Sequence, residues 1–178
     1  MLSRICLAWS RFALSAWVGA AVLFVINGVA QVTFPGFESI VRDQMTLIRF
    51  PNYYICGFSL VGSSLLALLV ISALKRGACP AALKCGCTRT PVLLTLLALI
   101  VMGIDYLWVY LPLAAMITPP GSPRTPQFIT LHKASMYINL VHVGLSLAAA
   151  WILCWPGTSD VLRQQTSPAP EGISSAGA

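Results

Sequence analysis

Four long runs of apolar residues dominate the chain, at about residues 12–32, 52–74, 91–117 and 132–155. Each run is long enough to cross the hydrocarbon core of a bilayer, which takes about 20 helical residues. None shows the alternation of polar and apolar residues that a barrel strand needs, and backbone groups in lipid must bond within their own segment. The pattern therefore predicts an all-α, four-helix membrane bundle whose main partner is the lipid bilayer.

The fourth run differs from the others because it carries a stripe of polar residues. His132, Ser135, Asn139, His142 and Ser146 follow one another at spacings of three and four. On a helix that turns by about 100° per residue, all of them fall within an arc of roughly 80°. Such a stripe must face protein, water or a ligand rather than lipid.

A shorter amphipathic stretch lies between the first two runs. From Phe37 to Arg49, apolar residues recur at helical spacing with charged and polar residues on the opposite face. Pro35 suits the first turn of this helix, and Pro51 suits its end. We expect a short helix that lies in the outer interface or packs as a helical loop on the bundle, and the sequence leaves both open.

Other segments predict packing and connections. Small residues at intervals of four, such as Ser15 with Gly19 and Gly144 with Ala148, favour close approach of helices. Residues 118–126 contain four prolines and are expected to be a non-helical connection. Residues 1–155 then form a single membrane domain, and residues 156–178, rich in Ser, Pro, Gly and Ala, predict a disordered tail.

Composition and charge agree with a membrane protein and suggest its orientation. The 178 residues are 57% hydrophobic and 9% charged, with a net charge of +6. Seven basic residues fall on the side of the termini: Arg4, Arg11, Lys75, Arg76, Lys84, Arg89 and Arg163. The other side has Arg42, Arg49, Arg124 and Lys133. This excess predicts cytoplasmic termini, and the charge gives no reason to expect nucleic-acid binding. The first run is longer than a typical signal peptide, so we expect it to be retained.

Asp105 is the only acidic residue deep inside a predicted span. A charged carboxylate there is unfavourable, so it should be protonated, paired or next to water. His142 is expected near the same depth in the fourth span. A pair of the two would be either a structural hydrogen bond between helices or the start of a proton or cation pathway.

Two amides on the first span suggest a binding pocket. Asn27 and Gln31 are four residues apart near its outer end. In an antiparallel bundle they should lie at the depth of Ser135 and Asn139. Together with His132, they would line a polar pocket that opens to the outer face and takes a small solute or an ion.

The sequence gives little support for a metal site, a cofactor or an enzyme activity. Cys79, Cys85 and Cys87 are close enough to chelate a soft metal, but they lack the paired Cys-x-x-Cys spacing of zinc sites. No phosphate loop, dinucleotide fingerprint, Gly-x-Ser-x-Gly elbow or His-Glu-x-x-His motif is present. We therefore expect no cofactor, assign no catalytic residue and favour a non-enzymatic protein.

The segment that carries the stripe also resembles a known family. The run Phe128-Ile-Thr-Leu-His132-Lys-Ala-Ser135-Met-Tyr-Ile-Asn139-Leu is similar to the closing His-x-x-Ser-x-x-x-Asn helix of the transmembrane-protein-205-like family of four-span membrane proteins. Trp17-Val-Gly19 and Phe50-Pro51-Asn-Tyr-Tyr54 also resemble that family. Its third-span signature is only approximated here, and the cysteine-rich loop is not expected in it. The resemblance implies that His132, Ser135 and Asn139 are shared polar positions, in a family of unsettled activity whose vertebrate branch is linked to platinum-drug resistance.

Three functions follow from these patterns. The first is a pocket for a small solute or an ion, lined by the polar stripe. The second is a structural or assembly protein, which includes self-association, in which the stripe forms hydrogen bonds between helices. The third is a metal-handling protein or membrane enzyme that uses Asp105, His142 or the loop cysteines.

Overall fold

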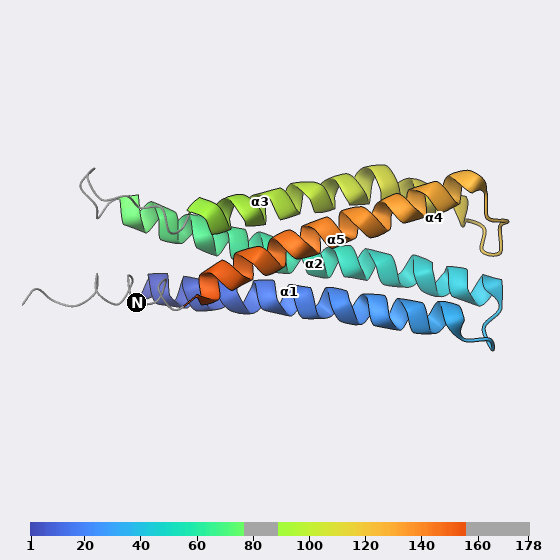
Figure 1. The fold of residues 1–178 in the computed structure, drawn as a ribbon, viewed down its shortest axis with the longest axis horizontal. Coiled ribbons are helices and arrows are strands. Elements are labelled where there is room, and N and C mark those ends of the chain that lie inside the picture. Colours follow the sequence, from blue (N-terminus) through green and yellow to red (C-terminus); the bar gives the residue numbers. More distant parts are fainter. Residues whose placement is uncertain (77–88, 156–178) are drawn as a thin grey trace, which may run out of the picture.

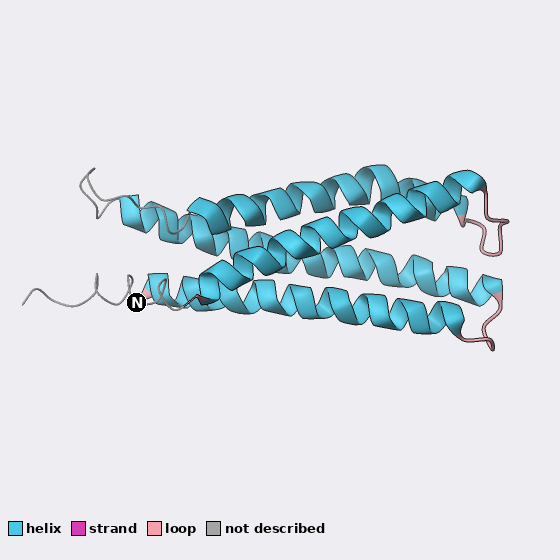
Figure 2. Ribbon diagram, viewed as in Figure 1, coloured by secondary structure: helices cyan, strands magenta, loops and turns pink. Residues whose placement is uncertain are grey.

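The computed structural model describes residues 1–76 and 89–155, and within them every regular element is helical (Figure 2). The elements are α1 (Leu2–Thr33), α2 (Ser39–Arg76), α3 (Arg89–Ile104), the π-helix η2 (Asp105–Tyr110), α4 (Leu111–Met116) and α5 (Pro126–Cys154). Four segments are long and apolar enough to cross a membrane: Leu2–Thr33, Ser39–Leu74, Arg89–Met116 and Pro126–Cys154. The prediction of an all-α chain with four candidate spans is confirmed.

The four long segments run antiparallel to their neighbours along the chain (Figure 1). α1 packs against α2 and α5, and α3 packs against the same two helices, so the bundle has four sides. Met1 and the end of α5 lie at one end, which we call the terminal end. The connections 34–38 and 117–125 lie at the other, which we call the loop end.

Local chemistry fixes both ends of α5. The Thr125 side chain accepts a hydrogen bond of 3.2 Å from the Phe128 N–H, and Pro126 occupies the first helical position. These are the preferred residues for a helix start because they satisfy or remove otherwise unpaired N–H groups. At the opposite end, Arg11 Nε of α1 donates to the Leu153 carbonyl oxygen at 2.7 Å, where a cation also complements the helix dipole. The predicted non-helical connection 118–126 is confirmed except at Pro126, which is the first residue of α5.

The amphipathic stretch is helical, but it does not form a separate short helix. Residues 39–50 are the first turns of α2, which continues through Pro51 into the second span. A proline inside a helix removes one backbone hydrogen bond without necessarily ending the helix. Asp43 in this stretch is buried. It accepts a hydrogen bond from the Gly121 N–H, and this contact holds the stretch on the bundle.

Large side chains pack in the interior together with several alanines and serines. Trp17, Tyr54 and Met102 are fully buried. A Cβ on Gly57 would lie 2.7 Å from the Trp17 ring and 2.9 Å from Met102 Sδ, so this glycine makes room for both. Gly19 and Gly144 have open space around them and point outward. The expectation that these two glycines mark helix contacts within the bundle was wrong.

Candidate functional site

The polar stripe of α5 faces the interior of the bundle over most of its length. Ser135, His142 and Ser146 are buried, and Asn139 is half-buried. His132 is exposed near the loop end, where its ring stacks on Phe128 with centroids 6.0 Å apart. The stripe therefore meets protein, and only its first residue lies outside the core.

Asp105 lies at the centre of the interior polar groups and opens the π-helix η2. Its side chain is fully buried. Asp105 Oδ2 accepts a hydrogen bond of 2.7 Å from the Tyr54 hydroxyl and one of 3.4 Å from Ser135 Oγ. Asp105 Oδ1 has no hydrogen-bond partner among the described residues. Short π-helical turns are often found at functional sites because they change the direction of one side chain.

Another hydrogen bond lies beside these two and links α2 directly to α5. The Tyr53 hydroxyl donates to Asn139 Oδ1 at 2.6 Å, and the rings of Tyr53 and Tyr54 meet edge to face with centroids 5.5 Å apart. We call Tyr53, Tyr54, Asp105, Ser135 and Asn139 the Asp105 cluster. It joins α2, η2 and α5 through hydroxyl, amide and carboxyl groups.

His142 is placed apart from Asp105. Its ring stacks on Trp17 with centroids 5.9 Å apart and an interplanar angle of 19°. Both imidazole nitrogens and Trp17 Nε1 are buried without a hydrogen-bond partner in the described part of the chain. The predicted pair of Asp105 and His142 is not formed. Ser135 lies at the depth of Asp105 instead, and His142 follows two helical turns later, about 10 Å along the axis.

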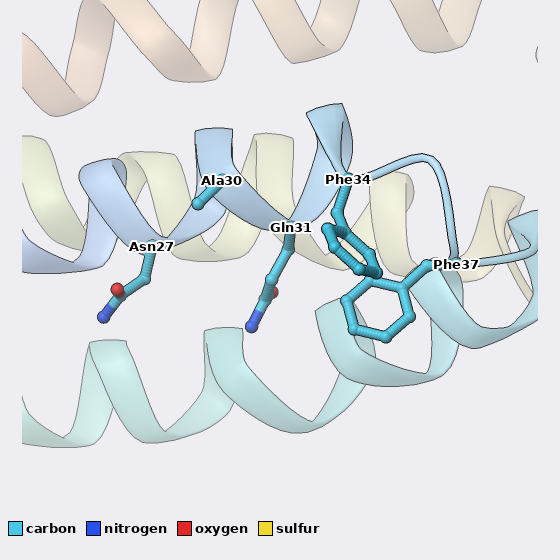
Figure 3. Close-up of a pocket in the computed structure, with 5 residues that line it drawn as sticks. All are labelled: Asn27, Ala30, Gln31, Phe34 and Phe37. Carbon is cyan, nitrogen blue, oxygen red and sulfur yellow. The ribbon is translucent and has the colours of Figure 1, made fainter.

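Asn27 and Gln31 line a separate hollow at the loop end. Its volume is about 240 Å³, and its walls are Asn27, Ala30, Gln31, Phe34 and Phe37. Figure 3 shows both amide side chains pointing the same way, toward α2. The Gln31 side chain accepts a hydrogen bond from Arg49 Nη1 of α2. The hollow contains no residue of α5, so the single pocket expected to join these amides to Ser135, Asn139 and His132 is not formed.

The described residues offer no ready-made metal site. No group of three or more His, Cys, Asp or Glu side chains gathers within residues 1–76 and 89–155. Cys79, Cys85 and Cys87 lie outside these residues. Asp105 has hydroxyl groups rather than further carboxylates or imidazoles around it, which is a poor donor set for a divalent transition metal.

Sequence reasoning missed two parts of this arrangement. It assigned no role to the hydroxyls of Tyr53 and Tyr54, although two tyrosines just inside a span are candidates for interior donors. It also missed Asp43, which accepts a hydrogen bond of 2.9 Å from the Gly121 N–H and forms an ion pair with Arg124. Asp43 is distant in sequence from the connection it holds, so no local pattern signals this contact.

No protein-family model, curated protein or solved structure matches the chain. The groups that bear on function are those that the bundle itself brings together. They are the Asp105 cluster, His142 with Trp17, and the hollow beside Asn27 and Gln31.

Proposed function

We propose that the chain is a multi-pass membrane protein that reversibly binds a proton at Asp105. One observation carries this proposal. A fully buried carboxyl group opens a π-helical turn, with one oxygen bonded by two hydroxyl groups and the other without a partner among the described residues. An ionisable side chain inside a membrane span is unfavourable, and such residues commonly mark ion pathways and proton relays.

The surroundings of Asp105 suit both of its protonation states. In the ionised state, Tyr54 and Ser135 donate hydrogen bonds to Oδ2 and stabilise the negative charge. In the protonated state, the same bonds can remain while the proton resides on Oδ1. The hydrogen bonds to Oδ2 are thus compatible with both protonation states.

A proton fits this site better than a larger ligand. Two hollows among the described residues lie away from Asp105, one beside Asn27 and Gln31 and the other against the outer face of α5 at Gly144, Ala148 and Trp151. A metal ion would need more oxygen ligands than one carboxylate and two hydroxyls provide.

Infrared difference spectroscopy tests the proposal directly. Purified protein in lipid is titrated while the carbonyl stretch of protonated carboxyl groups is recorded. We expect a band that Asp105→Asn abolishes and that Tyr54→Phe shifts in frequency. Glu38→Gln serves as the control, because Glu38 is an exposed carboxylate. A band can survive in Asp105→Asn from another carboxyl group, such as the buried Asp43, but a spectrum whose titrating bands are all unchanged in Asp105→Asn contradicts the proposal.

Transport is measured separately. Proteoliposomes with an internal pH-sensitive dye report whether proton binding leads to proton movement across the bilayer. We expect the wild type to dissipate a pH gradient faster than Asp105→Asn at equal protein content. If both variants bind lipid and fold alike but dissipate the gradient equally, the site is not a transport site.

The Tyr53–Asn139 hydrogen bond favours a second function, in which the cluster is structural. This bond joins α2 to α5 at 2.6 Å and contains no ionisable carboxyl or imidazole group. In this case Asn139→Leu lowers thermal stability in detergent while the titrating band and proton movement stay unchanged.

We also propose that both termini lie in the cytoplasm. The support is that three of the four opposing basic residues are engaged within the protein. Arg49 bonds Gln31 and the Phe24 carbonyl, Arg42 bonds the Phe34 carbonyl, and Arg124 pairs with Asp43. Arg124 is neutralised by Asp43, which leaves Arg42, Arg49 and Lys133 as the opposing charges against seven on the side of the termini. Antibody access to an epitope placed before Met1 or after Ser122 in intact cells distinguishes the two orientations.

Membership of the transmembrane-protein-205-like family stays a proposal. Its support is that Ser135 and Asn139, two of the three polar positions of the resemblance, are the α5 residues of the Asp105 cluster. His132, the third, lies outside the core. Under this proposal Ser135 and Asn139 are the positions whose chemistry relatives share.

A further inference from the structure

The hollow beside Asn27 and Gln31 has the chemistry of a phosphate site at the surface of a bilayer. Asn27 and Gln31 stand one helical turn apart on the same face of α1, and both amides reach toward α2 (Figure 3). Phe34 and Phe37 close one end of the hollow, with ring centroids 4.9 Å apart. The hollow thus combines polar donors with an apolar wall.

Two arginines of α2 bond to residues in the wall of this hollow and stand beside it rather than in its lining. Arg49 donates to the Gln31 side chain and, at 2.9 Å, to the Phe24 carbonyl, and its guanidinium lies 4.6 Å from the centre of the Phe24 ring. Arg42 donates to the Phe34 carbonyl at 3.2 Å. Arg42 Nε is buried and has no partner among the described residues. Each arginine is therefore anchored to α1 beside the hollow and keeps donor capacity.

The positive charge of these arginines is not neutralised locally. Among the described residues, neither Arg42 nor Arg49 forms an ion pair with a carboxylate. The buried acid of this end, Asp43, is already paired with Arg124. Two guanidinium groups that form no ion pair beside a hollow favour an anion, and guanidinium groups bind phosphate oxygens with particular strength.

The depth of the hollow matches the headgroup layer. α1 has 32 residues and is therefore about 48 Å long, whereas the hydrocarbon core is about 30 Å thick. If α1 is centred in the bilayer, roughly six residues protrude at each end. Asn27 and Gln31 belong to the last seven residues of α1. One turn before Asn27 on the same face of α1, Leu23 exposes an apolar side chain that can contact acyl chains.

We propose that this hollow binds the phosphate group of an anionic phospholipid, with the amides of Asn27 and Gln31 and the guanidinium groups of Arg42 and Arg49 as donors. The acyl chains of the same lipid then lie along Leu23, on the same face of α1. This site is independent of Asp105, because it lies at the surface of the loop end and shares no residue with the Asp105 cluster.

Native mass spectrometry of the full chain tests the proposal by counting bound phosphatidylglycerol and phosphatidylcholine over a range of lipid concentrations. We expect the wild type to retain phosphatidylglycerol preferentially. Arg42→Gln should weaken its binding by about tenfold, the usual effect of losing one charge-assisted hydrogen bond. Asn27→Leu should weaken it by a smaller factor, and because Asn27 is exposed this variant should fold normally.

Two control variants separate a specific site from general attraction. Lys133→Gln removes one exposed positive charge at the same end, and Gln44→Leu removes one exposed amide from the start of α2. We expect both to bind phosphatidylglycerol as the wild type does. Equal retention of the two lipids by the wild type, unchanged binding in Arg42→Gln and Asn27→Leu, or an equal loss in Lys133→Gln overturns the proposal.

Discussion

The Tyr53 hydroxyl donates a hydrogen bond of 2.6 Å to Asn139 Oδ1 and so joins the middle of α2 to the middle of α5. Tyr53→Phe removes the donor and keeps the ring that packs 4.8 Å from Trp17. Hydrogen bonds between helices in membranes are worth about 0.6 kcal/mol on average and at most about 1.7. We expect a loss of this size in unfolding experiments in detergent.

The control for this variant is Tyr137→Phe, since Tyr137 is exposed on α5. A double-mutant cycle of Tyr53→Phe with Asn139→Leu should give a coupling energy close to the loss in the single variant. If the losses of stability from the two substitutions are additive, Tyr53 and Asn139 are not joined by a hydrogen bond.

Gly57→Ala should destabilise the bundle. The new Cβ would lie 2.7 Å from the Trp17 ring and 2.9 Å from Met102 Sδ, both of them fully buried. Overpacking of this kind costs about 1–3 kcal/mol. Gly62→Ala is the matched control on the same helix, because nothing lies within 4 Å of its added Cβ. Thermal unfolding of the two variants side by side should lower the midpoint for Gly57→Ala only.

Asp43→Asn should loosen the connection between α4 and α5. Asp43 holds this connection through Arg124 and the Gly121 N–H. Gly121 has φ of 91°, a left-handed conformation that the Asp43 contact helps to fix. Hydrogen–deuterium exchange of residues 117–125 should become faster, while Glu38→Gln should leave it unchanged. If residues 117–125 exchange as slowly in Asp43→Asn as in the wild type, other contacts hold this connection.

His142→Phe should raise the stability of the purified protein. The phenyl ring keeps the stacking on Trp17 and removes two buried nitrogens that have no partner among the described residues. Leaving a polar group buried and unpaired costs about 1–3 kcal/mol, so the gain should be about 1 kcal/mol. His132→Phe, at an exposed position, should have no such effect. A lower unfolding midpoint for His142→Phe indicates that, in lipid, a bound molecule forms a hydrogen bond with the imidazole.

The fold was largely predictable because hydropathy and length act locally. Each apolar run determines its own helix, and short connections leave antiparallel packing as the simple outcome. The continuation of α2 through Pro51 was not predictable. Whether a helix breaks at a proline depends on what its first turns contact, and the contact of Asp43 with Gly121 and Arg124 involves residues nearly 80 positions away.

The candidate site was predictable in part, for a related reason. Helical periodicity correctly placed Ser135, His142 and Ser146 on one inward face of α5. Periodicity carries no information on the depth of one helix relative to another. The expected pairing of Asp105 with His142 was therefore wrong by two turns, and Tyr54 occupies the place given to the histidine.

The π-helical turn has a consequence for the length of the third span. Inward-facing residues before it follow steps of four and three: Pro91, Thr95, Ala98, Met102 and Asp105. After it both Val109 and Tyr110 are buried, followed by Leu113 and Ile117, so the inward face shifts by one residue across the π-helical turn. The span thus contains one residue more than a regular helix with the same inward face would need. A homologue that lacks this residue should align with a single gap between Tyr106 and Val109, and its helix should be straight where this one turns Asp105 into the core.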